Sequence, residues 1–104
     1  MSKSYKRIEA VRRAGEILKF LANQKEPITA PAIAHVTGAP LPTVMCHLVT
    51  LEELGFVQVI NDRWRIGLGL GLIWARVKAN LEGERDRIER DLESIRVEEA
   101  GHGQ

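Results

Sequence analysis

The feature that most restricts the fold of this chain is a pair of short helical patterns, residues 29–38 and 42–54, joined by a turn of a few residues. The first pattern begins at Thr29, a preferred N-cap residue, and has Pro31 in its first turn, where a missing N–H costs little. Gly38 ends it, because glycine readily takes the left-handed conformation after a C-cap. Two helices joined this closely must cross at a steep angle, which predicts a helix-turn-helix. The apolar stripe of the second pattern consists of Val44, Leu48, Leu51 and Leu54.

The segments on either side of this motif complete a compact domain. Before it, residues 5–24 predict a helix whose apolar face consists of Ile8, Val11, Ala14, Ile17, Leu18 and Leu21. After it, residues 56–60 and 63–66 predict two strands joined by Asn61-Asp62, a pair that tolerates the positive φ of a tight hairpin. Strand alternation places Trp64 toward the core and leaves Arg63 and Arg65 on the outer face. We therefore expect a mainly helical α+β fold over residues 1–69, a winged helix-turn-helix with three helices and a two-stranded wing.

A long charged helix is expected after the wing, over residues 70–98, followed by a disordered tail at 99–104. Four apolar residues fall seven apart, as in the a positions of a coiled coil, but two of the three d positions, Glu84 and Asp91, are charged. We interpret this segment as a dimerisation helix or a helix that packs on another protein; a free solvated helix is the alternative. The residues expected to make the contact are Trp74, Val77, Leu81, Ile88, Leu92 and Ile95.

Charge is distributed unevenly along the chain. Residues 1–79 carry 11 Lys/Arg against 6 Asp/Glu, a net +5, and residues 80–104 carry 4 Arg against 8 Asp/Glu, a net −4. A basic body fits a domain that faces nucleic acid. No apolar run is long enough to span a membrane, the first residues lack the features of a secretory signal, and Cys46 is the single cysteine. We therefore expect a protein of a reducing cytoplasm, encoded by a bacterium or a phage.

Several segments together resemble the N-terminal DNA-binding domain of IclR-type transcriptional regulators. The residues that carry the resemblance are Arg13–Ala22 in the first helix, residues 28–40 over the second helix and turn, Thr50–Val57 and Trp64–Gly67. The resemblance covers residues 8–72 and implies a dimeric winged helix that binds operator DNA, with the third helix in the major groove.

Two departures from that family affect what carries over. Family members continue into an effector-binding domain, whereas this chain ends after one helix, so we expect no effector domain and no ligand sensing. The family also begins its recognition helix with polar or basic residues and places an arginine near the middle. Here those positions are Leu41, Pro42 and Cys46.

The expected DNA contacts therefore separate into a neutral reading helix and cations outside it. Residues 27–51 contain no Lys, Arg, Asp or Glu, so the helix can offer only apolar contacts to thymine methyls and weak hydroxyl contacts to base edges. The reading positions are Pro42, Thr43, Met45, Cys46, Val49 and Thr50. Phosphate contacts are expected from Lys3, Lys6, Arg7, Arg12, Arg13, Arg63 and Arg65, and from backbone N–H groups near Thr29 and Ala30.

The sequence leaves one other function open. Leu41, Met45, Cys46 and Val49 could form an exposed apolar patch for a protein partner, which would make the chain an adaptor module with weak or no sequence-specific DNA binding. We favour a regulator of transcription that binds double-stranded DNA as a homodimer, because the basic body and wing have no comparable use in an adaptor.

Other combinations of residues do not predict a reactive site. His35, Cys46 and His47 could be considered as metal ligands, but Cys46 and His47 are adjacent on a helix and point about 100° apart. We expect His47 to be a partly buried neutral histidine and Cys46 a small apolar residue. The glycines of residues 67–71 lack the spacing of a phosphate-binding loop. We expect no enzyme activity, no metal and no cofactor.

Overall fold

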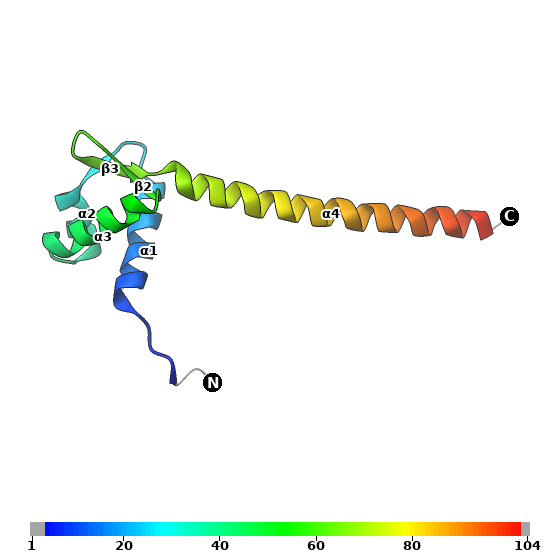
Figure 1. Cartoon of the computed structure of the whole chain (residues 1–104), viewed down its shortest axis with the longest axis horizontal. Helices are drawn as coiled ribbons and strands as arrows, with labels where there is room; N and C mark the ends of the chain where they lie inside the picture. The colour runs from blue at the N-terminus through cyan, green and yellow to red at the C-terminus, as the bar shows by residue number, and fades with distance from the viewer. Residues whose placement is uncertain (1–3, 103–104) are drawn as a thin grey trace. The chain divides into compact units, whose positions relative to one another are not determined.

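The computed structural model describes residues 4–102, which divide into two compact units, one ending at Gly71 and one beginning at Leu72. Most elements belong to the first unit, and the long helix α4 begins there and makes up the second (Figure 1). The elements in chain order are α1 (Glu9–Ala22), β1 (Ile28–Thr29), α2 (Ala30–Thr37), α3 (Leu41–Glu53), β2 (Val57–Ile60), β3 (Arg63–Ile66) and α4 (Leu68–His102). The expected fold, a mainly helical winged helix-turn-helix, is confirmed.

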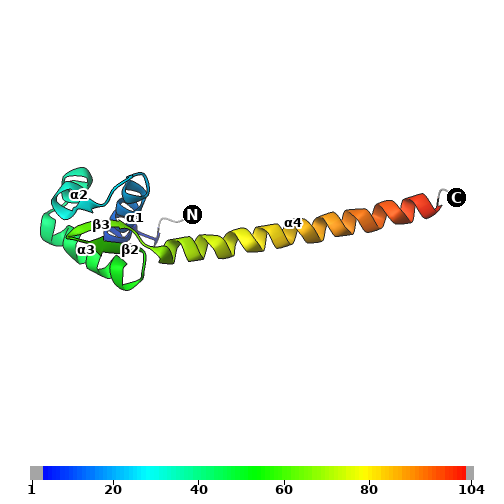
Figure 2. The ribbon, with the colours of Figure 1, turned by 90° about the horizontal axis from the view of Figure 1, so that it is seen from above.

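Helices α2 and α3 form the helix-turn-helix and are bent by 111° with respect to each other, within the range typical of this motif. The Thr29 hydroxyl accepts a hydrogen bond from the Ala32 N–H at 3.4 Å, so it caps α2 as expected. Gly38 ends α2 with a φ of 72°. In two perpendicular views, α2 and α3 lie next to each other beside the hairpin (Figures 1 and 2).

The sheet has three strands in the order β1-β3-β2, all antiparallel. The hairpin of β2 and β3 has the expected turn, with Asn61 and Asp62 at φ values of 49° and 63°. Strand β1 was not expected. Its two residues pair with β3, Ile28 with Trp64 and Thr29 with Arg63. It ties the entry of α2 to the wing, so the helix-turn-helix and the wing share backbone pairing.

The core lies between the three helices and one face of the sheet. Its buried side chains are Ile17, Leu21, Ala30, Ile33, Val44, Leu48, Leu51, Val57 and Trp64. Three residues expected to face inward are mostly exposed: Ile8 and Val11 at 66% each, and Leu54 at 55%. Ile8 precedes the first turn of α1, and Leu54 follows the end of α3, so both lie beyond the layer of core residues that the two helices bury.

Three glycines bring separate segments of the first unit into backbone contact. The Gly55 carbonyl accepts a hydrogen bond from the Gly69 N–H at 2.9 Å, and the Phe56 carbonyl accepts one from the Gly67 N–H at 2.8 Å. A Cβ on Gly67 would lie 2.5 Å from the Gly55 oxygen, and a Cβ on Gly69 would lie 2.6 Å from it. Only glycine fits these two positions without a shift of the backbone.

Helix α4 is longer than expected at both ends. It begins at Leu68 and continues to His102, which corrects the expected range of 70–98 and the disordered tail expected from residue 99. The last two residues of that tail lie outside the described residues. Helix α1, in contrast, is shorter than the expected range of 5–24, since it begins at Glu9 and ends at Ala22.

Candidate nucleic-acid interface

The outer face of α3 is a neutral surface of mixed apolar and small polar side chains. Val44, Leu48 and Leu51 are buried, and the helical period turns the residues between them outward. The exposed residues of this face before Leu51 are Leu41, Pro42, Met45, Cys46, Val49 and Thr50. Thr43 is half-buried, so of the expected reading positions it is the least accessible. Leu41 was expected only in an apolar patch, yet its side chain is 41% exposed beside the other reading positions.

Hydrogen bonds within α3 already use part of its polar capacity. The Thr50 hydroxyl donates to the Cys46 carbonyl at 2.8 Å, so toward a base it can act as an acceptor. The His47 Nδ1 lies 2.7 Å from the Thr43 carbonyl, to which it donates, and its Nε2 is buried with no hydrogen-bond partner among residues 4–102. His47 is therefore half-buried between α3 and the rest of the domain and does not reach the outer face.

The wing presents two arginines on the outer face of the sheet. Trp64 is buried on the opposite face, and strand alternation turns Arg63 and Arg65 outward together. Arg65 donates through Nε to the Gln58 side-chain oxygen at 3.1 Å, across the pair that these residues form between β2 and β3. Arg63 has no ion pair or side-chain hydrogen bond within the part of the chain that the structure describes. Both guanidinium groups can therefore still contact phosphates.

The cations of α1 are less available than the sequence suggested. Arg12 forms ion pairs with both Glu9 and Glu16, and Arg13 lies 3.7 Å from Glu9. The hydrogen bond from Arg12 holds the pKa of Glu9 below its ordinary value of 4.5, and that from Glu9 raises the pKa of Arg12. Both carboxylates are thus charged at neutral pH, and the charge of Arg12 is largely compensated within α1.

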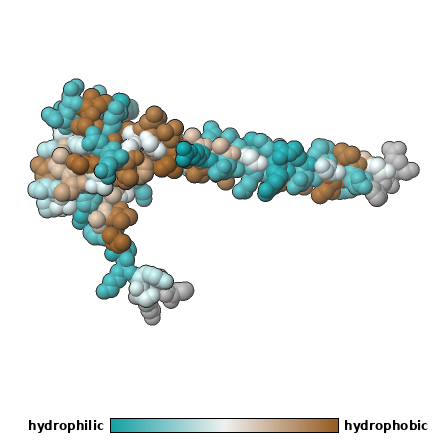
Figure 3. Space-filling view, in the orientation of Figure 1, coloured by the Kyte–Doolittle hydropathy of each residue, from teal (hydrophilic) through white to brown (hydrophobic). Residues whose placement is uncertain are grey.

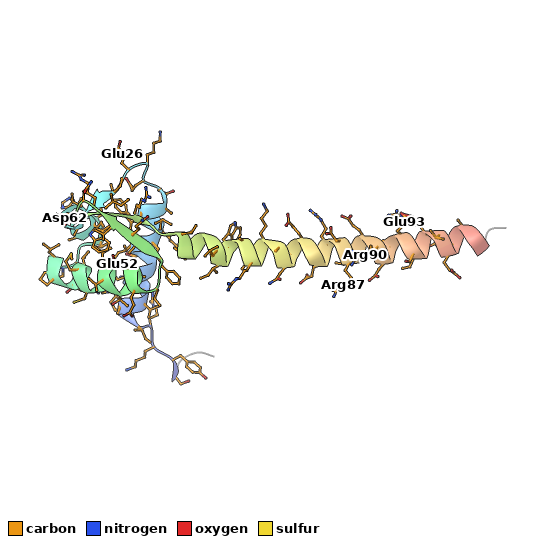
Figure 4. All side chains as sticks on the ribbon, turned by 45° about the horizontal axis from the view of Figure 1, so that its top comes forward. Glu26, Glu52, Asp62, Arg87, Arg90 and Glu93 are labelled. Atoms are coloured by element: carbon orange, nitrogen blue, oxygen red, sulfur yellow. The ribbon has the colours of Figure 1, made fainter. Side chains whose placement is uncertain are left out.

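The other expected phosphate contacts have mixed positions. Lys6 and Arg7 are exposed on the segment before α1, and Lys3 lies outside the described residues. The Ala30 side chain is buried and the Thr29 hydroxyl is used by the cap of α2, so only backbone atoms near these two residues could meet a phosphate. Figure 4 shows the wing tip by its Asp62 side chain, and the acidic Glu52 near the end of α3.

The described residues hold no group of three or more His, Cys, Asp or Glu side chains that could bind a metal ion. Cys46 is a free, exposed cysteine. Over the same residues, no single helix is long and apolar enough to cross a membrane; α2 and α3 reach the necessary length and composition only when they are taken together across their 111° bend.

Comparison with known proteins gives a family for the N-terminal unit. Residues 10–59 match the family model described as the IclR helix-turn-helix domain. This range includes α1, α2, α3 and most of β2. No curated protein matches the chain.

Three solved structures illustrate the likeness. An IclR transcriptional regulator from Alicyclobacillus acidocaldarius has 29% identity and a TM-score of 0.66 over 69% of this chain and 30% of its own. The repressor BlcR from Agobacterium tumefaciens has 27% identity and a TM-score of 0.57, over 66% and 28%. An IclR family transcriptional regulator from Brucella abortus has 27% identity and a TM-score of 0.57, over 62% and 26%. The chain therefore spans less than a third of the length of these proteins.

Proposed function

Because residues 10–59 of this chain belong to the IclR helix-turn-helix domain family, we propose that the protein binds double-stranded DNA in the regulation of transcription. That family consists of transcription regulators and not of enzymes. The observation that carries the proposal is the pairing of an exposed, neutral outer face on α3 with an exposed pair of arginines on the wing. The alternative of an adaptor module has no support from the comparisons.

In the proposed complex, α3 lies in the major groove and reads bases through neutral groups. Pro42, Met45, Cys46 and Val49 can contact thymine methyl groups, and the Thr50 hydroxyl can accept a hydrogen bond from an exposed base donor. None of these side chains can form the bidentate contact that arginine makes with guanine. We therefore expect a preference for sites rich in A·T pairs at the positions that α3 faces.

Affinity in this complex comes from cations outside α3. Neutralisation of phosphates supplies most of the free energy of non-specific binding, and the groups placed for it are Arg63, Arg65, Lys6 and Arg7. Arg12 and Arg13 are weaker candidates because Glu9 and Glu16 compete with phosphate for them.

The proposed protein is a homodimer held by α4. From residue 72 on, every side chain of α4 that the structure describes is exposed, including the six apolar residues expected to make the contact. Burial of such residues against a second helix would remove apolar surface from water. A full chain that sediments as a monomer would contradict this part of the proposal.

The test of DNA binding is the salt dependence of affinity for a duplex of random sequence. The logarithm of the binding constant should fall steeply with the logarithm of salt concentration, and Arg63→Ala/Arg65→Ala should reduce the slope by about 1 to 2 units, about 0.9 for each lost phosphate contact. The matched control is Arg76→Ala/Arg90→Ala, which removes the same charge from α4 and should leave the slope unchanged. Equal slopes in both double variants, or no binding at low salt, would contradict the proposal.

A further inference from the structure

Six apolar side chains form a narrow row along α4, which we call the apolar stripe: Trp74, Val77, Leu81, Ile88, Leu92 and Ile95. At about 100° of rotation per residue, all six point within about 60° of one another. Their exposed fractions run from 41% at Val77 to 65% at Trp74. Figure 3 shows hydrophobic patches along α4 separated by hydrophilic side chains, as expected where a narrow stripe is bordered by charged residues.

A helix with this stripe requires a partner. No residue between 72 and 101 is even half-buried, and the stability of helices in proteins comes mostly from packing of an apolar face. The ion pairs along the helix, such as Arg85 with Glu89 at 3.7 Å and Arg96 with Glu93 at 3.1 Å, contribute only about 0.3–0.5 kcal/mol each. A second copy of α4 offers a stripe of the same length and chemistry.

The spacing of the stripe is symmetric about the midpoint between Glu84 and Arg85. Trp74 and Ile95 are equally far from this point, and so are Val77 and Leu92, and Leu81 and Ile88. When a second α4 lies in the reverse direction over that midpoint, each apolar residue is level with an apolar residue of the other copy. Parallel, in-register pairing also matches the stripe, so a second observation must select the direction.

Charge selects the antiparallel direction. Residues 72–83 carry two cations and one anion, a net +1, and residues 84–102 carry 4 Arg against 7 Asp/Glu, a net −3. A parallel pair brings the two acidic halves together, whereas an antiparallel pair places each acidic half beside a basic one. The Lys78 side chain flanks the stripe, and in the antiparallel pair it is level with Asp91 of the second copy and about 3 Å along the axis from its Glu89. Charges that flank the seam set helix orientation in this way.

The break in the stripe does not oppose this pairing. Glu84 and Arg85 border the stripe at its centre, and two helices that meet there contribute two acidic and two basic side chains in either direction. The central layer is therefore neutral, and the choice of direction rests on the two ends.

We propose that α4 pairs with α4 of a second copy as an antiparallel two-helix seam centred between Glu84 and Arg85. This inference rests on the proposed dimer and adds its geometry. The two Gly71 residues, where the DNA-binding units begin, would be about 40 Å apart, compared with the 8–10 Å between axes of helices packed in parallel. That separation is close to the roughly 34–36 Å of one DNA turn between half-sites.

The test is a distance between spin labels in the full chain, on a Cys46→Ser background. An Ala100→Cys label, which lies off the stripe, should be about 45 Å from its copy in the antiparallel pair, because 31 helical residues separate the two positions at 1.5 Å each. Parallel pairing would bring the same labels within about 25 Å, the width of two packed helices with their side chains. A Gly83→Cys label lies near the centre and should give a short distance in both directions, so it reports pairing itself.

Disulfide formation gives a second readout that does not depend on labels. A mixture of Leu81→Cys chains and Ile88→Cys chains should form mixed disulfides, and each variant alone should form fewer. Preferential Leu81→Cys homodisulfides with a short distance at residue 100 would overturn the antiparallel direction and leave the dimer standing. Absence of dipolar coupling at both labels would overturn the dimer and the seam together, while the salt-dependence experiment would still test DNA binding.

Discussion

Replacement of Gly69 by alanine tests the backbone contact that joins the end of α3, the wing and the start of α4. The added Cβ would lie 2.6 Å from the Gly55 oxygen and 2.9 Å from its carbonyl carbon. Both atoms belong to backbone, so neither can turn away as the end of a flexible side chain could. Gly55 itself has a φ of 80°, and its position is fixed by the end of α3.

The size of the effect follows from what must give way. Inserting a methyl group into a packed position costs about 1–3 kcal/mol, and loss of the Gly69 N–H bond to the Gly55 carbonyl adds about 0.5–1.5 kcal/mol. The preference of alanine for a helix offsets up to about 1 kcal/mol. We expect a loss of about 1–3 kcal/mol in the free energy of unfolding of the first unit, a large part of the roughly 4–10 kcal/mol typical of a domain of this length.

Urea denaturation followed by tryptophan fluorescence measures this loss. Trp64 is buried in the core of the first unit, whereas Trp74 is exposed on α4, so a Trp74→Phe background makes the signal specific for the first unit. With a slope of about 1 kcal/mol/M for a small domain, the midpoint should fall by about 1–3 M. The slope itself should stay the same, because the unfolded state and the surface exposed do not change.

Two other glycines of α4 serve as controls of the same chemistry. A Cβ on Gly71 would meet only Leu68 Cδ1 at 4.0 Å, and one on Gly83 would meet no atom within 4 Å. Gly71→Ala should therefore be neutral or slightly stabilising in the same assay, and Gly83→Ala should raise the helicity of α4. If Gly69→Ala unfolds at the same urea concentration as Gly71→Ala, the reasoning about the Gly55 contact is refuted.

Two further predictions concern α1 and the core. Glu9→Gln should free Arg12 for phosphate and steepen the salt dependence of binding to duplex DNA by up to about 0.9 units; Glu26→Gln is the control of equal charge and should not. Because Arg12 lowers the pKa of Glu9, the pair is intact at pH 7 and is lost only as the pH falls below the ordinary value of 4.5, so the assay belongs at neutral pH, and equal slopes in the two variants would contradict the competition. Ile33, which is fully buried, should cost about 2–5 kcal/mol when replaced by alanine, and urea denaturation with a loss below about 1 kcal/mol would place it outside the core.

Local chemistry was sufficient to predict most of the fold. Thr29 and Gly38 mark the two ends of α2 because a side-chain cap and a left-handed glycine are properties of single residues and their neighbours. Asn61-Asp62 marks the hairpin for the same reason. Strand β1 could not be predicted in this way, because two residues are too few to show alternation and their pairing with β3 is a contact across the chain.

The errors at the ends of helices have a related cause. Leu54 continues the apolar period of α3, yet the helix ends at Glu53 and no core layer remains beyond it. Periodicity shows which side of a helix is apolar but not how far the packed layer extends. The tail expected from residue 99 failed because polar and glycine residues do not by themselves end a long helix.

The candidate site was predicted in part. Exposure of Arg63 and Arg65 follows from the alternation of β3, and exposure of Met45 and Cys46 from the period of α3. The pairing of Arg12 was missed, although Glu9 and Glu16 stand three and four residues away from it, the spacing at which helical ion pairs form. That signal was present in the sequence and would have lowered the rank of Arg12 as a phosphate contact.

The neutral face of α3 has a consequence for how such a protein would choose among sequences. Contacts between uncharged side chains and base edges release no counterions, so ionic strength acts on the wing and the N-terminal segment and not on the reading helix. When salt rises, the affinities for a preferred and a random duplex should then fall by the same factor. Discrimination between the two would stay constant while occupancy of both declines, which separates recognition from attachment in different parts of one small domain.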